Sequence, residues 1–221
     1  MFIGHYSVAY AAKAVAPKAP LAAYFLAVQA LDVLFGIFVL SGVEHMEIVH
    51  KYTSYNPYRL YDMPITHSLV GSLGWAVAVG IVAAVLRLPR RESLWLGLAV
   101  FSHFILDLAV HTPDLSIAGN DTVKLGLGLW NNVPAVIALE LLVLTGGWLL
   151  FTRSQRSDPT FPKQRNRIFF GVLAVLTIVT PFMPDPSSPT VFAMQALVSY
   201  CVLAGASAWS TQKTQVSDAE T

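Results

Sequence analysis

The chain has 221 residues, of which 55% are hydrophobic and only 12% are charged, with a formal net charge of +1. Soluble domains carry about 25% charged residues, and the apolar residues here cluster in long runs, so the composition excludes an ordinary soluble domain and predicts an integral membrane protein. The small net charge gives no indication of a nucleic-acid partner, and we expect none.

The first apolar segment, residues 2–16, is too short to cross a membrane, and two prolines, Pro17 and Pro20, separate it from the next one. We predict a short re-entrant or interfacial helix that returns to the cytoplasmic face near Lys13 and Lys18. No basic residue precedes its apolar stretch, so we expect no cleaved signal peptide.

Six later segments approach the roughly 20 apolar residues that a membrane-spanning helix needs. They predict an all-α fold, a polytopic membrane bundle that forms one domain over residues 1–210, followed by a polar, disordered tail at 211–221. The only cysteine, Cys201, lies in the sixth segment and is expected to be a buried thiol. The predicted spans are residues 21–43, 66–87, 92–112, 132–152, 168–183 and 190–210.

Basic residues concentrate in the loop between the second and third spans and in the loop between the fourth and fifth. Because cytoplasmic loops carry such an excess, both loops are predicted to be cytoplasmic. Six spans then place both termini in the cytoplasm, and the loops 44–65 and 113–131 on the outer side of a bacterial inner membrane. The basic residues are Arg87, Arg90 and Arg91 in the first loop, and Arg153, Arg156, Lys163, Arg165 and Arg167 in the second.

The third span carries three ionisable residues, His103, Asp107 and His111, at a spacing of four. This spacing places them on one face of a helix, where imidazole and carboxylate groups can share a divalent ion, or act as a ligand and its hydrogen-bond partner. Ionisable groups inside a membrane are costly and usually functional. A polar network that joins helices is the alternative interpretation.

Asp32, His67 and His5 are also predicted to lie at membrane depth. At about 1.5 Å of rise per residue, one broad layer contains His5, Asp32, His103 and Asp107, so a single pocket that opens outward is compatible with the sequence. His67 lies higher and follows a turn at Pro64 that would aim it inward.

For some polar residues a structural role competes with a functional one. His67 has a second interpretation, as part of a cap on the second span. Glu140 has no apparent partner near it in the sequence, which favours a structural role. His45 and His50 lie in a loop rich in tyrosine and charge and are expected to be solvated.

Four short stretches resemble the YdjM-type membrane proteins, a family described as inner-membrane metal-dependent hydrolases. The resemblance covers about the first half of the chain, and it implies metal ligands at His5, Asp32, His67, His103 and Asp107. The stretches are GHYSVAYAAK at 4–13, FLAVQALDVLFG at 25–36, ITHSLVGSL at 65–73 and LAVFSHFILDLAVHTPD at 98–114.

Two departures from the family pattern bear on the metal count. The family often has a Pro-Asp-x-Asp pair where this chain has the single Asp32, and His-Arg ahead of the Thr-His motif where this chain reads YDMP at 61–64. The missing carboxylate puts a two-metal site in doubt, although His111 and Asp114 would compensate for it.

Together these observations predict a metal-dependent hydrolase that acts on an ester or phosphoester near the outer leaflet, where a lipid-like compound is the natural substrate for a membrane-embedded site. A bound divalent ion, zinc by its ligand types, lowers the pKa of a bound water to about 7, with Asp107 or Asp114 as general base. A proton- or ion-coupled transporter and a non-catalytic membrane scaffold are the alternatives. The predicted metal ligands are His5, Asp32, His67, His103, Asp107 and His111.

Overall fold

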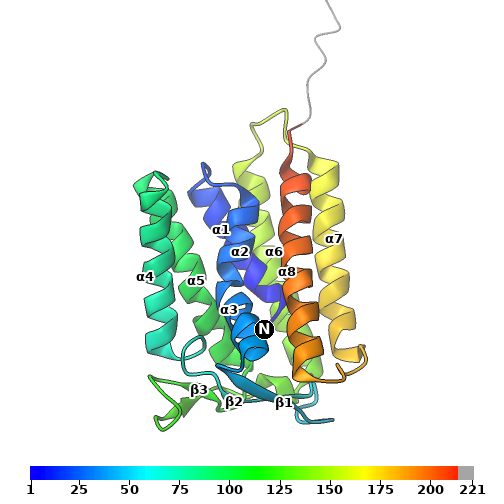
Figure 1. Cartoon of the computed structure of the whole chain (residues 1–221). Helices are drawn as coiled ribbons and strands as arrows, with labels where there is room; N and C mark the ends of the chain where they lie inside the picture. Colours follow the sequence, from blue (N-terminus) through cyan, green and yellow to red (C-terminus); the bar gives the residue numbers. More distant parts are fainter. Residues whose placement is uncertain (214–221) are drawn as a thin grey trace, which may run out of the picture.

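The computed structural model describes residues 1–213, and these residues form eight α-helices that stand side by side as a bundle (Figure 1). The helices are α1 (Tyr6–Val15), α2 (Leu21–Val28), α3 (Ala30–Ser41), α4 (Leu69–Val85), α5 (Arg90–Val110), α6 (Val133–Ser154), α7 (Lys163–Val179) and α8 (Pro189–Thr211). Single 3-10 turns occupy Ile3–His5 (η1), Leu129–Asn131 (η2) and Thr180–Phe182 (η3). The tail predicted to be disordered, residues 211–221, lies mostly outside the described residues, which end at Lys213, two residues after α8.

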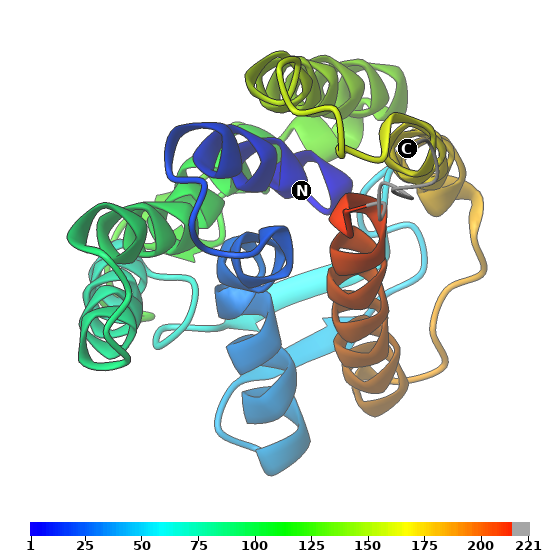
Figure 2. The ribbon, with the colours of Figure 1, turned by 90° about the horizontal axis from the view of Figure 1, so that it is seen from above.

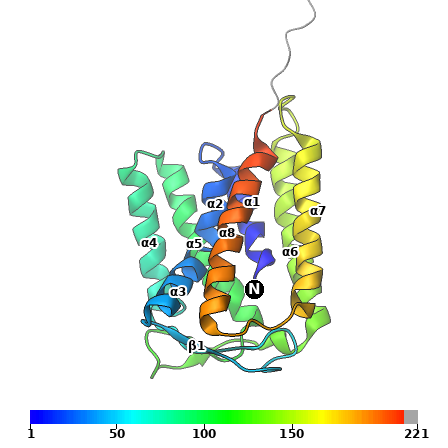
Figure 3. The same cartoon turned by 45° about the vertical axis from the view of Figure 1, so that its right-hand side comes forward.

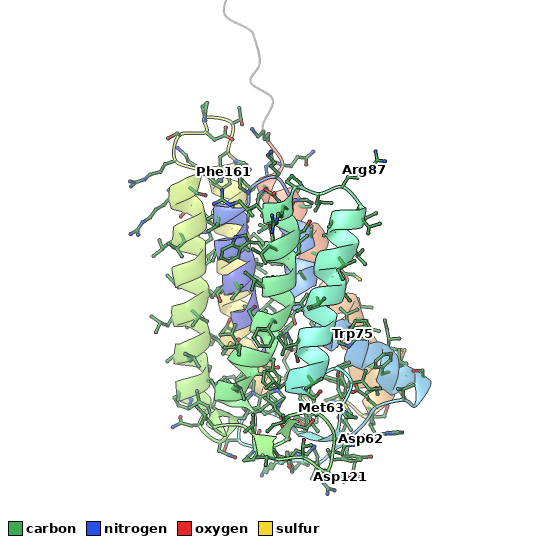
Figure 4. The ribbon with its side chains drawn as sticks, turned by 90° about the vertical axis from the view of Figure 1, so that its left-hand side faces the viewer. Asp62, Met63, Trp75, Arg87, Asp121 and Phe161 are labelled. Carbon is green, nitrogen blue, oxygen red and sulfur yellow. The ribbon has the colours of Figure 1, made fainter. Side chains whose placement is uncertain are left out.

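Two small antiparallel strand pairs close one end of the bundle, a modest departure from the all-α prediction. Strand β1 (His45–Ile48) pairs with β2 (Tyr58–Asp62), and β3 (Leu115–Ser116) pairs with β4 (Lys124–Leu125). Figure 4 shows Asp62 and Asp121 at this end, whereas Arg87 and Phe161 lie at the opposite end. The basic loops thus lie at one end of the bundle and the strands at the other.

The bundle has four helices long and apolar enough to cross a membrane among the described residues: α5, α6, α7 extended through η3, and α8. The bent pair of α2 and α3 counts as a fifth if it is one span, while α4, with 17 residues, is shorter than these. The chain is therefore a mostly helical protein of membrane type, and the predicted count of six spans is not confirmed.

The outward faces of these helices are apolar, which corrects the expectation for Cys201. This residue is exposed on α8, beside Val198 and Val202, which are 63% and 61% exposed. In a membrane the outer face of a helix meets hydrocarbon, so an apolar neighbourhood in the sequence does not indicate burial inside the protein.

The first predicted span is broken rather than straight. The helices α2 and α3 meet at Gln29 with a bend of 55°, and α3 leans away from the axis of α2 (Figure 2). Gln29 is fully buried, and its side-chain amide donates a hydrogen bond of 3.0 Å to the carbonyl of Phe2. The bend starts α3 inside the bundle and places Asp32 in its first turn.

The N-terminal segment lies inside the bundle, so the re-entrant prediction describes it better than the interfacial one. Residues Ile3, His5, Tyr6 and Tyr10 are completely buried, and the N-terminus lies among the helices (Figure 1). Glu140 of α6 holds this segment: its Oε1 accepts a hydrogen bond from the Phe2 nitrogen at 3.2 Å, and its Oε2 accepts one from the Gly4 nitrogen at 2.9 Å. The structural role expected for Glu140 is therefore observed.

Helix α1 packs on α6 at very close range, and Gly147 permits the contact. A Cβ atom added at Gly147 would overlap the backbone of Ser7, whereas one added at the neighbouring Gly146 meets nothing within 4 Å. Small residues allow this kind of backbone approach between membrane helices.

The first prediction compares these two glycines. Gly147→Ala is expected to destabilise the protein in detergent by about 1–3 kcal/mol, because the new methyl group overpacks the α1–α6 contact. The control Gly146→Ala should melt at the wild-type temperature or slightly above it, since alanine favours helix. Equal melting temperatures for the two variants would contradict the close packing of α1 on α6.

Candidate metal centre

The six predicted ligands meet in one cluster inside the bundle. The segment η1 supplies His5, α3 supplies Asp32, and the turn before α4 supplies His67, while the remaining three come from α5 and its C-cap. The side chain of Asp32 is 21% exposed, and the other five residues are at most 3% exposed. The members are His5, Asp32, His67, His103, Asp107 and His111.

Asp107 lies at the centre of this cluster, with its two carboxylate oxygens facing different partners. Its Oδ1 lies 3.2 Å from His5 Nε2 and accepts a hydrogen bond of 2.6 Å from the N-terminal ammonium of Met1. Its Oδ2 lies 3.0 Å from His103 Nε2, 3.5 Å from His111 Nε2 and 4.0 Å from His67 Nε2. One buried carboxylate thus connects all four imidazole rings.

Three ligand atoms of the cluster lie close enough together to hold a metal ion. Asp32 Oδ1 lies 3.2 Å from His67 Nε2 and 3.4 Å from His103 Nε2, and all three atoms lie within 4.8 Å of one another. Ligands bound at about 2.0–2.2 Å to a tetrahedral zinc ion are about 3.3–3.6 Å apart. The ligand atoms of a second group, His5, His103 and Asp107, also lie within 4.8 Å of one another.

A backbone carbonyl orients the ring of His103. Its Nδ1 lies 2.7 Å from the carbonyl oxygen of Val28, which can only accept, so Nδ1 carries the hydrogen. Val28 ends α2, where carbonyl groups lack helical partners, so the bend at Gln29 provides this acceptor. In the neutral ring, Nε2 therefore presents a lone pair to the cluster.

A hydrogen-bond chain from Glu44 orients His67 in the same way. The Thr66 hydroxyl donates to Glu44 Oε2 at 2.6 Å, which leaves its oxygen free to accept from His67 Nδ1 at 2.8 Å. Glu44 is fully buried and also accepts from the backbone nitrogens of Ile65 and Thr66 at 2.7 and 3.0 Å. His67 Nε2 lies 3.2 Å from Asp32 Oδ1, a hydrogen bond in which Nε2 donates and the carboxylate accepts. A neutral ring with Nδ1 protonated would instead offer Nε2 to a metal ion.

Asp114 orients His111. Its Oδ1 accepts from His111 Nδ1 at 2.8 Å, and its Oδ2 accepts from the Thr112 hydroxyl at 2.8 Å. The ring of His111 also packs on Trp130, with centroids 4.0 Å apart. The Nε2 atom of His111 consequently points at Asp107, while Asp114 lies behind the ring.

His5 is the one imidazole of the cluster without a hydrogen-bonded orienting group among residues 1–213. Its ring stacks on His103 with centroids 3.9 Å apart and an interplanar angle of 7°. Its Nδ1 is buried without a hydrogen-bond partner there, and its Nε2 lies 3.2 Å from Asp107 Oδ1. A buried polar atom without a partner is unfavourable, so this position could hold a ligand such as a metal ion.

Two contributors to the cluster were not found in the sequence. Glu44 begins a stretch that was interpreted as solvated, and Tyr200, whose hydroxyl donates to Asp32 Oδ2 at 2.9 Å, lies 168 residues from its partner. His45 and His50 of the same loop are exposed as expected, with side-chain exposures of 49% and 76%. Neither joins the cluster: each contacts an aspartate at the surface.

A cavity of about 950 Å³ leads from the strand end of the bundle to the cluster. Residues of α3, α8, the β1–β2 hairpin and the loop between α7 and α8 line it. Helices α3 and α8 run side by side above β1 (Figure 3). Asp32, His67, Asp107 and His111 line its inner end. Most of the other lining residues are apolar or aromatic, among them Phe35, Tyr55, Tyr58, Leu60, Met63, Trp130, Val191, Phe192, Met194, Ala196 and Val198.

Tyr58 contributes an uncharged phenol to the outer part of the cavity. Burial raises the pKa of this phenol to about 12, and the nearby charge of Asp185 acts in the same direction. The hydroxyl therefore stays protonated at neutral pH.

None of the protein-family models, curated proteins and solved structures compared with the chain matches it. Function therefore has to be inferred from the chain's own residues. Four imidazoles and two carboxylates, largely buried and at ligand spacing, form a donor set suited to a divalent metal ion such as zinc.

The second prediction tests the chain of hydrogen bonds behind His67. In Glu44→Gln the amide donates to Thr66, whose hydroxyl then donates to His67 Nδ1 and moves the ring hydrogen to Nε2. Zinc affinity, measured by competition with a chelator, should fall about 10–100-fold, the usual effect of losing an orienting partner.

The matched control is Glu47→Gln in the same hairpin, where the carboxylate is 47% exposed and pairs with Arg59. This variant should bind zinc like the wild type. Unchanged affinity in Glu44→Gln would show that Thr66 does not set the hydrogen position on His67.

Proposed function

We propose that the chain is a membrane-embedded, metal-dependent hydrolase that cleaves an ester or phosphoester bond in a lipid-like substrate. The observation that carries this proposal is a buried cluster in which three histidines have Nδ1 occupied and Nε2 directed inward, at the inner end of a largely apolar cavity. The resemblance of the first half of the chain to the YdjM-type family supports the same chemistry.

In this proposal Asp32, His67 and His103 would hold the ion, and the ion would supply an activated water for hydrolysis. Three protein ligands and a water are the arrangement of catalytic zinc sites, where the ion lowers the pKa of the water to about 7. Asp107 Oδ2 lies 3.0 Å from His103 Nε2 and lines the cavity, so Asp107 is placed to accept a proton from that water.

The role of Asp114 differs from the sequence-based expectation. Its two oxygens are occupied by His111 and Thr112, and it does not line the cavity. We therefore assign Asp114 to the positioning of His111 and keep Asp107 as the candidate general base. The overlapping group of His5, His103 and Asp107 is an alternative position for the ion.

An ion-coupled transporter is the second candidate, because broken helices that expose ligand groups inside the membrane are common in transporters. The break between α2 and α3 beside Asp32 is such a feature. Transport would require a path to the opposite end of the bundle, whereas the cavity opens toward the strand end.

We also propose the orientation and the membrane. Helix α4 provides the sixth crossing, packed against α5, and the strand pairs face outward from a bacterial inner membrane with both termini in the cytoplasm. Tyr200 lies 11 residues from the start of α8, so Asp32 lies about 16 Å below the outer end of that helix. The ion and the scissile bond would then meet near the middle of the bilayer.

The third prediction tests the metal. Purified wild-type protein should contain close to one zinc ion or more per chain by elemental analysis, and His103→Ala should lose it because two ligand groups share this residue. The control His45→Ala, which alters an exposed surface histidine, should retain the metal. Equal metal content in His103→Ala and the wild type would refute the ligand assignment.

The fourth prediction tests the orientation on a Cys201→Ser background. A cysteine at Ser157, in the basic loop between α6 and α7, should resist a membrane-impermeant thiol reagent added to intact cells. A cysteine at Asp121, at the strand end, should react with it. The opposite pattern of labelling would overturn the proposed orientation.

A further inference from the structure

The cavity reaches the lipid-facing side of the bundle as well as its strand end. Val198 and Met194 of α8 line it, and they are also 63% and 48% exposed on the outer surface of the helix. A residue that contributes to both surfaces lies at the rim of an opening. The cavity therefore has a mouth beside α8 at the depth of the hydrocarbon.

The inner wall of this mouth is a stripe on α8. Phe192, Ala196 and Tyr200 are spaced by four, so they lie on one face of the helix, and all three line the cavity. The stripe is apolar until it reaches the Tyr200 hydroxyl, which contacts Asp32. A ligand that follows this stripe meets apolar groups along its length and the ligand cluster at its inner end.

Charge limits what the cavity accepts. Among the described residues, its lining contains neither lysine nor arginine, and its charged groups are the Met1 ammonium and the carboxylates of Asp32, Asp107 and Asp185. The ammonium pairs with Asp107, and the two charges of one divalent ion would be offset by Asp32 and Asp185. With neutral imidazoles, no net positive charge would then be left to attract a ligand with a net negative charge.

We propose that the cavity takes a hydrocarbon chain of a membrane lipid through the mouth beside α8, and that the lipid has a head group without net negative charge. This inference rests on the proposed function and names its substrate class. A volume of about 950 Å³ is at the upper end of the range of about 300–1,000 Å³ found for small-molecule sites. The lipid's ester-bearing end would lie at Asp32, and its chain would lie along Phe192 and Ala196.

Photo-crosslinking in vesicles tests this proposal without requiring turnover. The full chain is reconstituted with a trace of phosphatidylcholine that carries a diazirine on one acyl chain, or with phosphatidylglycerol of identical chains. After irradiation, the label is mapped by mass spectrometry. Phe35 is the diagnostic position, because it lines the cavity but is only 4% exposed, so surrounding bilayer lipid does not reach it.

We expect the zwitterionic probe to label Phe35 at least 10-fold more than the anionic probe. Ala196→Trp fills the stripe and should reduce this label at least 10-fold, while Val202→Trp, on the exposed face of α8 outside the cavity, should leave it unchanged. Ser199→Trp is a second blocking variant, and melting temperatures show which variants are folded.

Unreduced labelling of Phe35 in the folded blocking variants, or no labelling of Phe35 in the wild type, would overturn the chain site. Equal labelling by the two probes would overturn the head-group selectivity. The zinc content of the same samples distinguishes a failure of the lipid-chain site from a failure of the metal centre. Zinc that is present without cavity labelling refutes this inference alone, whereas absent zinc refutes the proposed metal centre.

Discussion

The structure depends on how the buried carboxylate of Asp107 is accommodated. A single carboxylate at the centre of a membrane helix costs roughly 2.5–3.5 kcal/mol on insertion scales, and Asp32 adds a second one nearby. Four imidazole rings surround Asp107 at 3.0–4.0 Å, and they come from segments far apart in the sequence. A cation shared by these groups would offset the cost for all of them at once.

The surrounding fold can be followed outward from this cluster. His103 uses a carbonyl made available by the bend at Gln29, and His67 uses a hydrogen-bond chain that reaches Glu44 before β1. Glu140 of α6 fixes the segment that carries His5. The broken helix, the buried N-terminal segment and the hairpin therefore share one physical cause, because each supplies or orients a member of the cluster.

The three cluster residues of α5 could be predicted from the sequence, because helical spacing alone places His103, Asp107 and His111 on one face. The remaining geometry depends on contacts between distant segments. No proline marks the bend at Gln29, and the partnership of Tyr200 with Asp32 spans 168 residues. Glu44 was missed because its neighbours are polar and exposed, and the exposure of Cys201 was missed because hydropathy does not separate lipid-facing from core-facing residues.

The predicted six spans are not equal helices, for a reason that hydropathy does not detect. Hydropathy measures the length of an apolar run, but the first run is divided by a bend of 55°, and α4 is shortened by a cap in which Ser68 Oγ accepts from the Gly71 nitrogen. Both changes serve the cluster, since they fix the start of α3 next to Asp32 and the turn that carries His67.

The most direct test of the metal centre is an anomalous difference map, recorded at the zinc edge from crystals of the zinc-loaded protein. The account predicts a peak bonded at about 2.0–2.2 Å to Asp32 Oδ1 and to the Nε2 atoms of His67 and His103. A map without a peak among these three residues, or with zinc only at the surface pairs of His45 and His50, would contradict it.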